Sequence, residues 1–255
     1  MQILVLLLIF LLPACANKSK NIGPSQFSLD SYQAYTENDF VDHLTQFNRF
    51  YSENYQNIIR KKDFAEAYLN RNIDKILLNN ELFFKNLKNV KINILKDERP
   101  YYFSLPQNEI YISTGLFKKY INHESELMSV LTYEMIRLEK KIYNKSMIIP
   151  TGYLSLERIL SMNRISFEIK NELHKWSFYI LKRSGFDASI YLSWLQILNR
   201  NTIDFQVLLG DTSSISREET MFKKFLVDIN EALSLQEGKT SSSADFYKFI
   251  NTIGS

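Results

Sequence analysis

The sequence has very little of the residues that many catalytic and structural motifs need. It contains one cysteine, Cys15, so an intramolecular disulfide is excluded. Its 7 glycines include no G-x-S-x-G sequence and leave little room for a glycine-rich phosphate loop. The histidines are His43, His123 and His174, which leaves few candidates for a catalytic triad or a histidine-rich metal site.

A strong charge of either sign is also missing. The 31 lysines and arginines against 28 aspartates and glutamates give a net charge of +3, and no basic run is interleaved with aromatic residues. Such a small excess does not predict nucleic-acid binding. Residues 36–255 are long enough to bury one sizeable core, so we expect a single domain there.

The long apolar run of the chain is residues 1–14, which carry no lysine or arginine and are too short to span a bilayer comfortably. They are predicted to be a signal peptide. The sequence Leu-Pro-Ala-Cys that ends at Cys15 resembles a bacterial lipobox, with an atypical proline. The resemblance implies cleavage before Cys15 and lipidation of that residue, and several acyl chains would anchor the protein stably. An ordinary signal peptide containing a cysteine and a retained membrane anchor are the alternatives.

After Cys15 the composition becomes polar. Residues 15–35 are rich in serine, lysine and asparagine, which is typical of a flexible tether between an anchor and a domain. Ala16 is not the aspartate that retains many Gram-negative lipoproteins in the inner membrane. We therefore expect a lipid-anchored protein of the cell envelope that faces the periplasm, with the outer membrane favoured.

The spacing of apolar residues predicts an α+β domain that is mostly helical. Helical periodicity is present over residues 39–56, 64–87, 126–141, 161–184, 187–198, 217–233 and 245–253. Alternation predicts strands over 90–94, 101–105 and 109–113, which would form a small three-stranded sheet beside helix 126–141.

Helix 126–141 carries a glutamate in the middle of its apolar face. Leu127, Val130, Leu131 and Leu138 share that face with Glu134. A carboxylate in this position predicts a polar site beneath the helix. The alternative is that Glu134 sits at the edge of the apolar stripe and extends into solvent.

Three blocks around this helix resemble a known family in their sequence and order. They are 101–116 (YYFSLPQNEIYISTGL), 125–137 (SELMSVLTYEMIR) and 172–187 (ELHKWSFYILKRSGFD). The blocks resemble NAFALPGGxIYVTxGL, DELAAVLAHExxH and EAD…LxxAGYD of the HtpX-type, CAAX-prenyl-protease-like zinc metallopeptidases. The resemblance spans roughly residues 70–233 and implies a gluzincin-type helical domain.

The departures from this family concern its zinc ligands. Tyr133 and Arg137 stand where the two histidines of HExxH would be, while Glu134 keeps the place of the general base. Glu172 falls on the third zinc ligand, and His174 replaces the aspartate of EAD. A protonated tyrosine and a permanently cationic arginine do not hold zinc. The resemblance therefore implies vestigial catalytic and metal positions and no cofactor.

A later family block, THPxxxER, resembles residues 211–219 loosely. Ser213 and Glu219 would replace its histidine and arginine.

Loss of a dication from between buried carboxylates leaves negative charge that must be compensated. Arg137 is one turn beyond Glu134 and, by the geometry of the family, near Glu172. We therefore predict a buried Arg137–Glu172 ion pair in place of the metal-ligand bonds.

The function predicted from the sequence is that of a catalytically inactive metallopeptidase homologue, a binding or assembly factor of the cell envelope. Its expected partners are a lipid membrane through Cys15 and an envelope protein or an unfolded polypeptide, with no nucleic acid. One alternative is an active zinc metalloendopeptidase of envelope protein quality control with an atypical site. Another is an unrelated helical lipoprotein.

Overall fold

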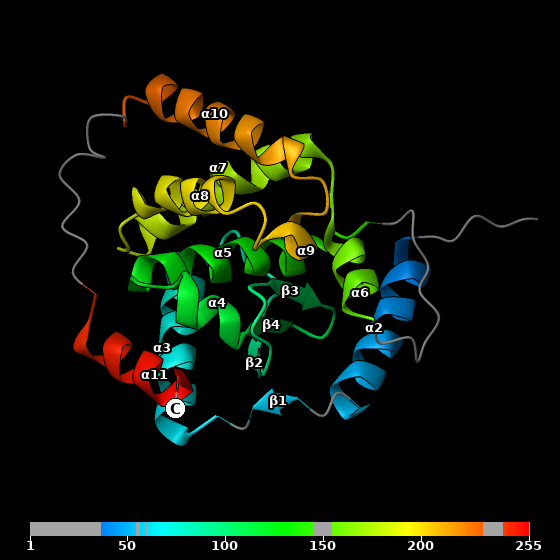
Figure 1. The fold of residues 1–255 in the computed structure, drawn as a ribbon. Helices are drawn as coiled ribbons and strands as arrows, with labels where there is room; N and C mark the ends of the chain where they lie inside the picture. The colour runs from blue at the N-terminus through cyan, green and yellow to red at the C-terminus, as the bar shows by residue number, and fades with distance from the viewer. Residues whose placement is uncertain (1–36, 55–56, 60, 145–154, 232–241, 255) are drawn as a thin grey trace, which may run out of the picture. The chain divides into compact units, whose positions relative to one another are not determined.

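The computed structural model describes residues 37–54, 57–59, 61–144, 155–231 and 242–254 (Figure 1). The predicted signal peptide, the lipidation site Cys15 and the tether to residue 35 lie outside these residues. None of the described helices is long and apolar enough to cross a membrane.

A four-stranded mixed sheet lies at the centre of the described residues. Its strands are β1 (Ile58–Ile59), β2 (Lys91–Leu95), β3 (Tyr102–Leu105) and β4 (Glu109–Ser113), in the order β1-β2-β4-β3. Strands β2 and β4 are parallel, and the other two pairs are antiparallel. The three strands expected from alternation are present, but the prediction of a sheet with only three strands is wrong. The added β1 has two residues, too few to show a period.

The turn between β3 and β4 uses residues in the left-handed conformation. Gln107 and Asn108 have φ angles of 71° and 60°. These values are typical of tight hairpin turns, where glycine and asparagine are favoured. The two residues stand where the resembled family has two glycines. The turn therefore has positive φ angles at two residues that are not glycine.

Helices make up most of the described chain, which confirms a predominantly helical α+β fold. They are α2 (Glu37–Asn54), α3 (Asp63–Asn79), α4 (Thr114–Lys119), α5 (Glu124–Lys140), α6 (Leu156–Asn163), α7 (Phe167–Arg183), α8 (Ile190–Arg200), α9 (Gln206–Leu209), α10 (Ser213–Asp228) and α11 (Ala244–Gly254). The single helix predicted over 161–184 is wrong. The chain leaves the helical conformation at Arg164 and starts α7 after Ser166, which has extended backbone angles.

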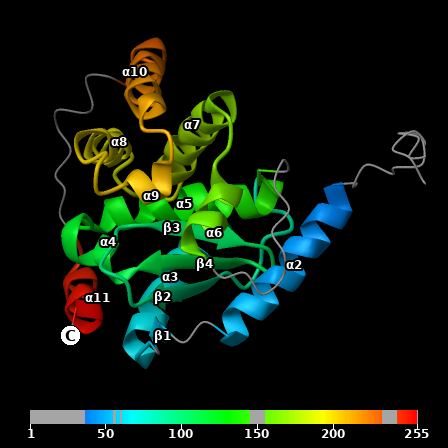
Figure 2. The ribbon, with the colours of Figure 1, turned by 45° about the vertical axis from the view of Figure 1, so that its right-hand side comes forward.

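The two faces of the sheet belong to two apolar cores. Ile92, Ile94, Ile110 and Ile112 point to the larger core, which includes buried residues of α3, α5, α7, α8, α10 and α11. The alternate residues of β3 and β4 point to the second core, shared with α2 and α6. Figure 2 shows α5 beside the sheet, with α2 and α6, the helices of the second core, also next to the strands. This alternation is the expected consequence of the two-residue period of a strand.

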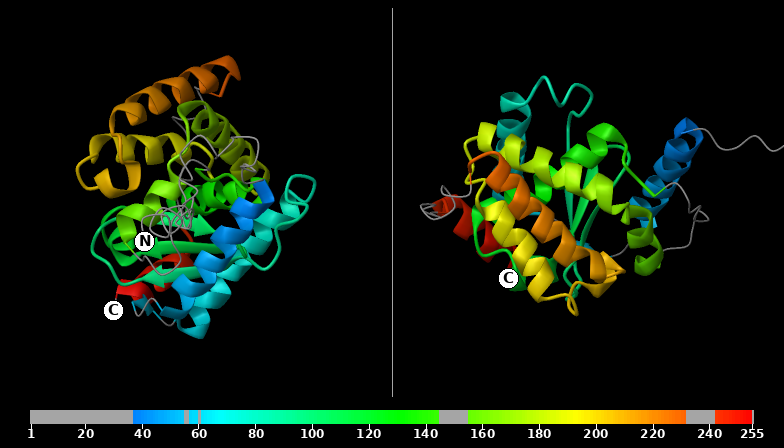
Figure 3. Two further views of the ribbon diagram at one scale, coloured as in Figure 1. Left: turned by 90° about the vertical axis from the view of Figure 1, so that its right-hand side faces the viewer. Right: turned by 90° about the horizontal axis from the view of Figure 1, so that it is seen from above.

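Helix α5 lies between the sheet and an outer layer of helices. It contacts β3 on one side and helices α7 and α8 on the other. Helix α10 packs against α7 and α8, further from the sheet (Figures 1 and 3). Because α5 has neighbours on both sides, residues around most of its circumference are buried. Glu134 and Arg137, which are buried in its second half, therefore need partners inside the protein.

Candidate functional site

Glu134 lies in the interior of the domain, as the polar-site interpretation of its helix predicts. Its relative exposure is 1%, so the alternative in which it extends into solvent is wrong. It belongs to a set of buried and half-buried polar side chains from α5, α7, α8 and α10, which we call the interior polar cluster: Tyr133, Glu134, Arg137, Lys170, His174, Tyr191 and Glu218. Tyr102 of β3 adjoins this cluster from the sheet side.

The closest partner of Glu134 is Arg137, one turn further along α5. The Arg137 Nη1 atom lies 3.1 Å from Oε1 and 3.2 Å from Oε2 of Glu134, and Arg137 Nη2 donates to the Ile142 carbonyl at 3.3 Å. The two side chains are 3% and 1% exposed. Burial alone would lower the pKa of Arg137, but the Glu134 carboxylate and nearby phenols outweigh it and raise that pKa. Glu134 and Arg137 therefore form a buried ion pair.

The predicted ion pair between Arg137 and Glu172 is wrong. The Glu172 side chain is 62% exposed and pairs with Lys175 on its own helix at 2.7 Å. The reason is the orientation of α7, which buries Leu173, His174 and the residues one and two turns beyond them. Glu172 lies outside that stripe, and Arg137 has Glu134 within reach on its own helix.

Glu218 of α10 supplies the second buried carboxylate of the interior polar cluster. It accepts hydrogen bonds from Lys170 Nζ at 2.9 Å and from Ser214 Oγ at 2.9 Å, and it contacts His174 Nε2 at 3.1 Å. Burial acts to raise the pKa of Glu218, but the His174 hydrogen bond and the Lys170 charge outweigh it and lower that pKa to about 2. Glu218 is therefore ionised at neutral pH.

His174 connects this carboxylate to the motif helix. Its ring is stacked on that of Tyr133 with centroids 5.5 Å apart, and its Nδ1 lies 2.9 Å from the Tyr191 hydroxyl. Burial lowers the pKa of His174 even though Glu218 opposes that effect, so the ring is neutral at pH 7. An ionised Glu218 can only accept, so Nε2–H donates to it and Nδ1 accepts from Tyr191. His174 thus joins Glu218 of α10 to Tyr133 of α5.

The interior polar cluster surrounds a cavity of only about 50 Å³. Leu208 and Leu209 line it on the side of α9, together with Arg164 at the end of α6. Arg164 donates to the Val207 carbonyl at 2.9 Å and to Glu157 at 2.7 Å. Gly210 permits this arrangement, because a Cβ atom there would lie 2.4 Å from Arg164 Nε. A space of this size holds a water molecule or so and excludes a peptide.

The residues at the metallopeptidase positions do not fit zinc. Burial raises the pKa of Tyr133 well above its usual value, so its phenol stays protonated. Arg137 brings a positive charge, and it already occupies the Glu134 carboxylate. Glu172 lies outside the cluster. Within the described residues, no group of three or more His, Cys, Asp or Glu side chains is placed to hold a metal ion.

Sequence reasoning missed the roles of Glu218 and Lys170. The signal for Glu218 was present, because it lies on α10 between Ile215 and Phe222 at helical spacing and all three are buried. This is the pattern that identified Glu134. The loose family alignment points to the neighbouring residue, Glu219, instead. Glu219 contacts Asn199 and Lys223 at the edge of the helix.

Comparisons with known proteins do not assign the chain to a family. No protein-family model matches the chain. No curated protein matches its sequence either.

Proposed function

We propose that this chain is an exported, lipid-anchored homologue of zinc metallopeptidases that does not hydrolyse peptides and serves as a binding or assembly factor of the cell envelope. The observation that carries the proposal is the buried Glu134–Arg137 ion pair, with a nitrogen 3.1 Å from a carboxylate oxygen. It supports inactivity because the residue in the position of the general base is engaged with a fixed cation. The periplasmic orientation and outer-membrane anchorage rest on the sequence around Cys15.

The chemistry of peptide hydrolysis explains why this pairing matters. A general base must take a proton from the attacking water, whose pKa is about 15.7 without a metal. Glu134 shares both oxygens with Arg137, and the cavity beside it is about 50 Å³. A scissile peptide bond has no room there, and a water in the cavity has neither a metal nor a free carboxylate beside it to activate it. The interior polar cluster is a self-neutralised part of the core.

An apolar groove beside α5 and α7 supports a binding role. It has a volume of about 330 Å³ and lies over Phe83, Ile136, Ile142, Leu173 and Trp176. Of the two tryptophans, Trp176 is 48% exposed and Trp194 is 2% exposed. The groove rim carries both Lys140 and Glu172, so it does not select one sign of charge. These features suit the isolated apolar side chains of an unfolded polypeptide.

Binding can be measured with the full-length protein and fluorescein-labelled, carboxymethylated α-lactalbumin as an unfolded probe, by fluorescence anisotropy. We expect saturable binding that Trp176→Ala weakens by about tenfold or more, as is usual for a buried aromatic anchor. Tyr247→Ala is the matched control, because Tyr247 is a 51% exposed aromatic on α11 and does not line the groove. Equal weakening by both variants, or no binding, contradicts the assignment.

Catalytic inactivity needs a separate test. Elemental analysis of the purified full-length protein should give no stoichiometric zinc. Incubation with the same unfolded probe should give no chelator-sensitive cleavage, and Glu134→Gln should leave any background unchanged. One zinc per chain together with cleavage lost in Glu134→Gln would instead establish the active metalloendopeptidase alternative.

One observation favours the alternative of an unrelated helical lipoprotein. Glu172, which aligns with the third zinc ligand of the family, is 62% exposed. Burial of Glu134 beneath α5 favours the metallopeptidase ancestry. Both interpretations share the export signal, and they differ in the origin of the fold.

A further inference from the structure

A second concave site lies on the opposite side of the domain from the interior polar cluster, where the start of α3, the end of β2, α4 and α11 meet. We call it the basic pocket. Its volume is about 450 Å³, which is within the usual range for small-ligand sites, and four lysines line it: Lys61, Lys62, Lys96 and Lys118. Glu98 is the one acidic residue in its lining. Four lysines against one glutamate give the lining of the pocket a net positive charge.

The four lysine ammonium groups differ in the interactions that they make within the protein. Lys61 donates to the Ile92 carbonyl at 2.6 Å, and Lys118 pairs with Glu98 at 3.3 Å. Lys62 and Lys96 are exposed and form no ion pair with any described residue. Burial lowers the pKa of Lys61, Glu66 opposes this effect, and Lys91 adds to it. An anion in the pocket would stabilise the charged form of all four groups.

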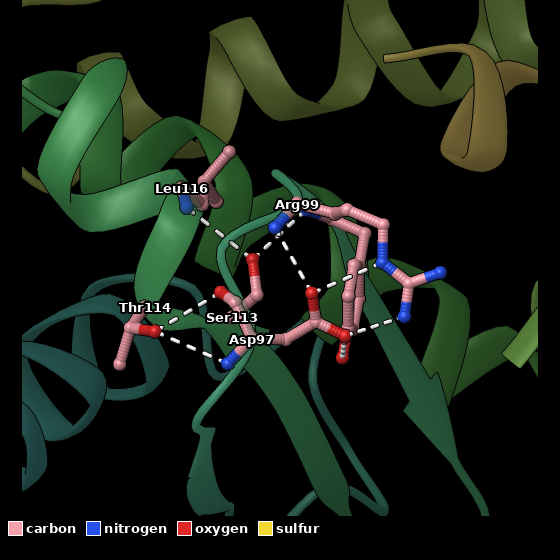
Figure 4. Close-up of polar contacts among 6 residues, drawn as sticks. Asp97, Arg99, Ser113, Thr114 and Leu116 are labelled. Atoms are coloured by element: carbon pink, nitrogen blue, oxygen red, sulfur yellow. Dashed lines mark hydrogen bonds and ion pairs between the residues drawn. The ribbon is translucent and has the colours of Figure 1, made fainter. Parts of the chain in front are cut away.

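The wall that carries Lys96 and Glu98 is fixed in place. Thr114 Oγ1 donates to the Asp97 carbonyl at 3.0 Å and accepts from the Asp97 amide at 3.2 Å (Figure 4). The Gly115 amide donates to the same carbonyl at 2.8 Å. A Cβ atom on Gly115 would lie 2.2 Å from the Glu98 carbonyl oxygen, so glycine is needed for this contact. The loop after β2 is thus attached to the start of α4, which carries Lys118.

The same loop is rigid on its outer side. Asp97 accepts from the Arg99 amide and side chain at 2.9, 3.0 and 2.6 Å, and Ser113 Oγ accepts from the Tyr101 amide at 3.0 Å (Figure 4). Little conformational entropy remains to be lost here when a ligand binds.

The floor of the pocket is apolar, in contrast to its rim. Ile59, Ala65, Ile94 and Ile253 form it, and three of them are buried. A bare inorganic anion would use only the rim. A molecule with an anionic group and an attached organic part would use both surfaces, and a phosphate ester combines high charge with that amphipathic shape.

We propose that the basic pocket binds the phosphate group of an organic phosphate, with the esterified portion against the apolar floor. The shared chemistry is a phosphate ester, which a free metabolite-sized phosphate or the headgroup of an anionic phospholipid can supply. This assignment is independent of the interior polar cluster and of the apolar groove.

The test uses full-length protein and glycerol 3-phosphate in titration calorimetry, with glycerol as the uncharged control. We expect binding of glycerol 3-phosphate alone, weakened about tenfold or more in Lys62→Gln/Lys96→Gln, because charge-assisted hydrogen bonds are lost. Lys88→Gln/Lys224→Gln removes the same charge from exposed lysines outside the pocket and should bind as wild type. Glu98→Gln should strengthen binding several-fold, because it releases Lys118 from its ion pair.

Vesicles distinguish the two sources. The wild type and both lysine variants are co-sedimented with phosphatidylcholine vesicles and with vesicles that also contain phosphatidylglycerol. The N-terminal apolar segment contributes equally to both vesicle types, so the difference between them is the readout. A gain with phosphatidylglycerol that Lys62→Gln/Lys96→Gln abolishes assigns a lipid headgroup. Binding of glycerol 3-phosphate without this gain assigns a soluble phosphate. Binding of neither, or equal losses in the pocket and control variants, overturns the proposal.

Discussion

The Arg137 guanidinium lies 3.1 Å and 3.2 Å from the two carboxylate oxygens of Glu134, three residues earlier on the same buried helix. A charge pair on one helix needs no tertiary movement to form, because residues at i and i+3 are neighbours. It neutralises the carboxylate where a metal-dependent enzyme would need that carboxylate as a base.

Arg137→Ala should destabilise the domain strongly. Removal of the guanidinium leaves the Glu134 carboxylate, 1% exposed, without its cation, and orphaning a buried charge typically costs about 3–5 kcal/mol. The check is denaturant unfolding followed by far-UV circular dichroism. Glu134→Leu/Arg137→Leu should lose much less than the sum of the two single changes, which a double-mutant cycle would measure.

The control for this cycle is the Glu172–Lys175 pair, which has the same i,i+3 spacing but a Glu172 side chain that is 62% exposed. Glu172→Ala should change the free energy of unfolding by less than about 1 kcal/mol. If Arg137→Ala has as small an effect as Glu172→Ala, the Glu134–Arg137 pair does not stabilise the fold.

The stability of the domain should fall in acid, with Glu218 as one identifiable source. Its pKa is about 2 in the folded domain against an ordinary value of 4.5. A carboxylate with a depressed folded pKa stabilises the fold above its unfolded pKa, and this stabilisation is lost as the pH falls from about 4.5 to about 2. Glu218→Gln should therefore be less stable than wild type at pH 7, with a smaller difference at pH 3. Thermal melts over this range give the measurement.

His174 contributes in a different pH window. Burial lowers its pKa from the ordinary 6.5, so the unfolded chain binds the proton first as the pH falls. Stability from neutral His174 is present above about pH 6.5 and declines below it. A wild-type profile that is flat between pH 7 and pH 5, together with an identical profile for His174→Gln, would contradict the buried neutral ring.

Much of the fold follows from local patterns, and the site follows from them only in part. Glu134 was predictable because one carboxylate interrupts a clear apolar stripe on α5. The buried position predicted for Glu172 rests on a family alignment and is wrong. The apolar residues of α7 already indicate that Glu172 lies outside the buried face of the helix. The rotation of a helix about its axis is decided by its whole apolar face and not by one aligned residue.

Other features depend on tertiary contacts that a single sequence does not reveal. The approach of Glu218 on α10 to His174 on α7 joins residues 44 positions apart. The basic pocket joins residues from the start of α3 to the end of α11. In both cases each segment carries polar residues that look like ordinary solvated side chains until the packing of the helices is known.

Membrane anchorage should depend on Cys15, a residue outside the described part of the chain. The prediction is based on the apolar run that ends in Leu-Pro-Ala-Cys. Cys15→Ser should release the protein from membranes or leave it unprocessed, as judged by fractionation and by mass spectrometry of the mature N-terminus. Cys15→Ala should behave in the same way, since neither variant offers a sulfur to acylate. A mature N-terminus at another residue, without an acyl group, would contradict the prediction.

The last prediction concerns the origin of the fold and uses the double substitution Tyr133→His/Arg137→His. It rebuilds the HExxH spacing on α5 and removes the cation that occupies Glu134. We expect this variant to gain zinc, with His174 or Glu218 of the interior polar cluster as the third ligand, because both are buried there while Glu172 is 62% exposed. Adding Glu218→Gln or His174→Gln should therefore weaken zinc binding about tenfold or more, whereas adding Glu172→Gln should not. Elemental analysis and calorimetry measure this. If Glu172→Gln alone abolishes zinc binding, the family alignment is right about the third ligand and α7 must rotate when the metal binds.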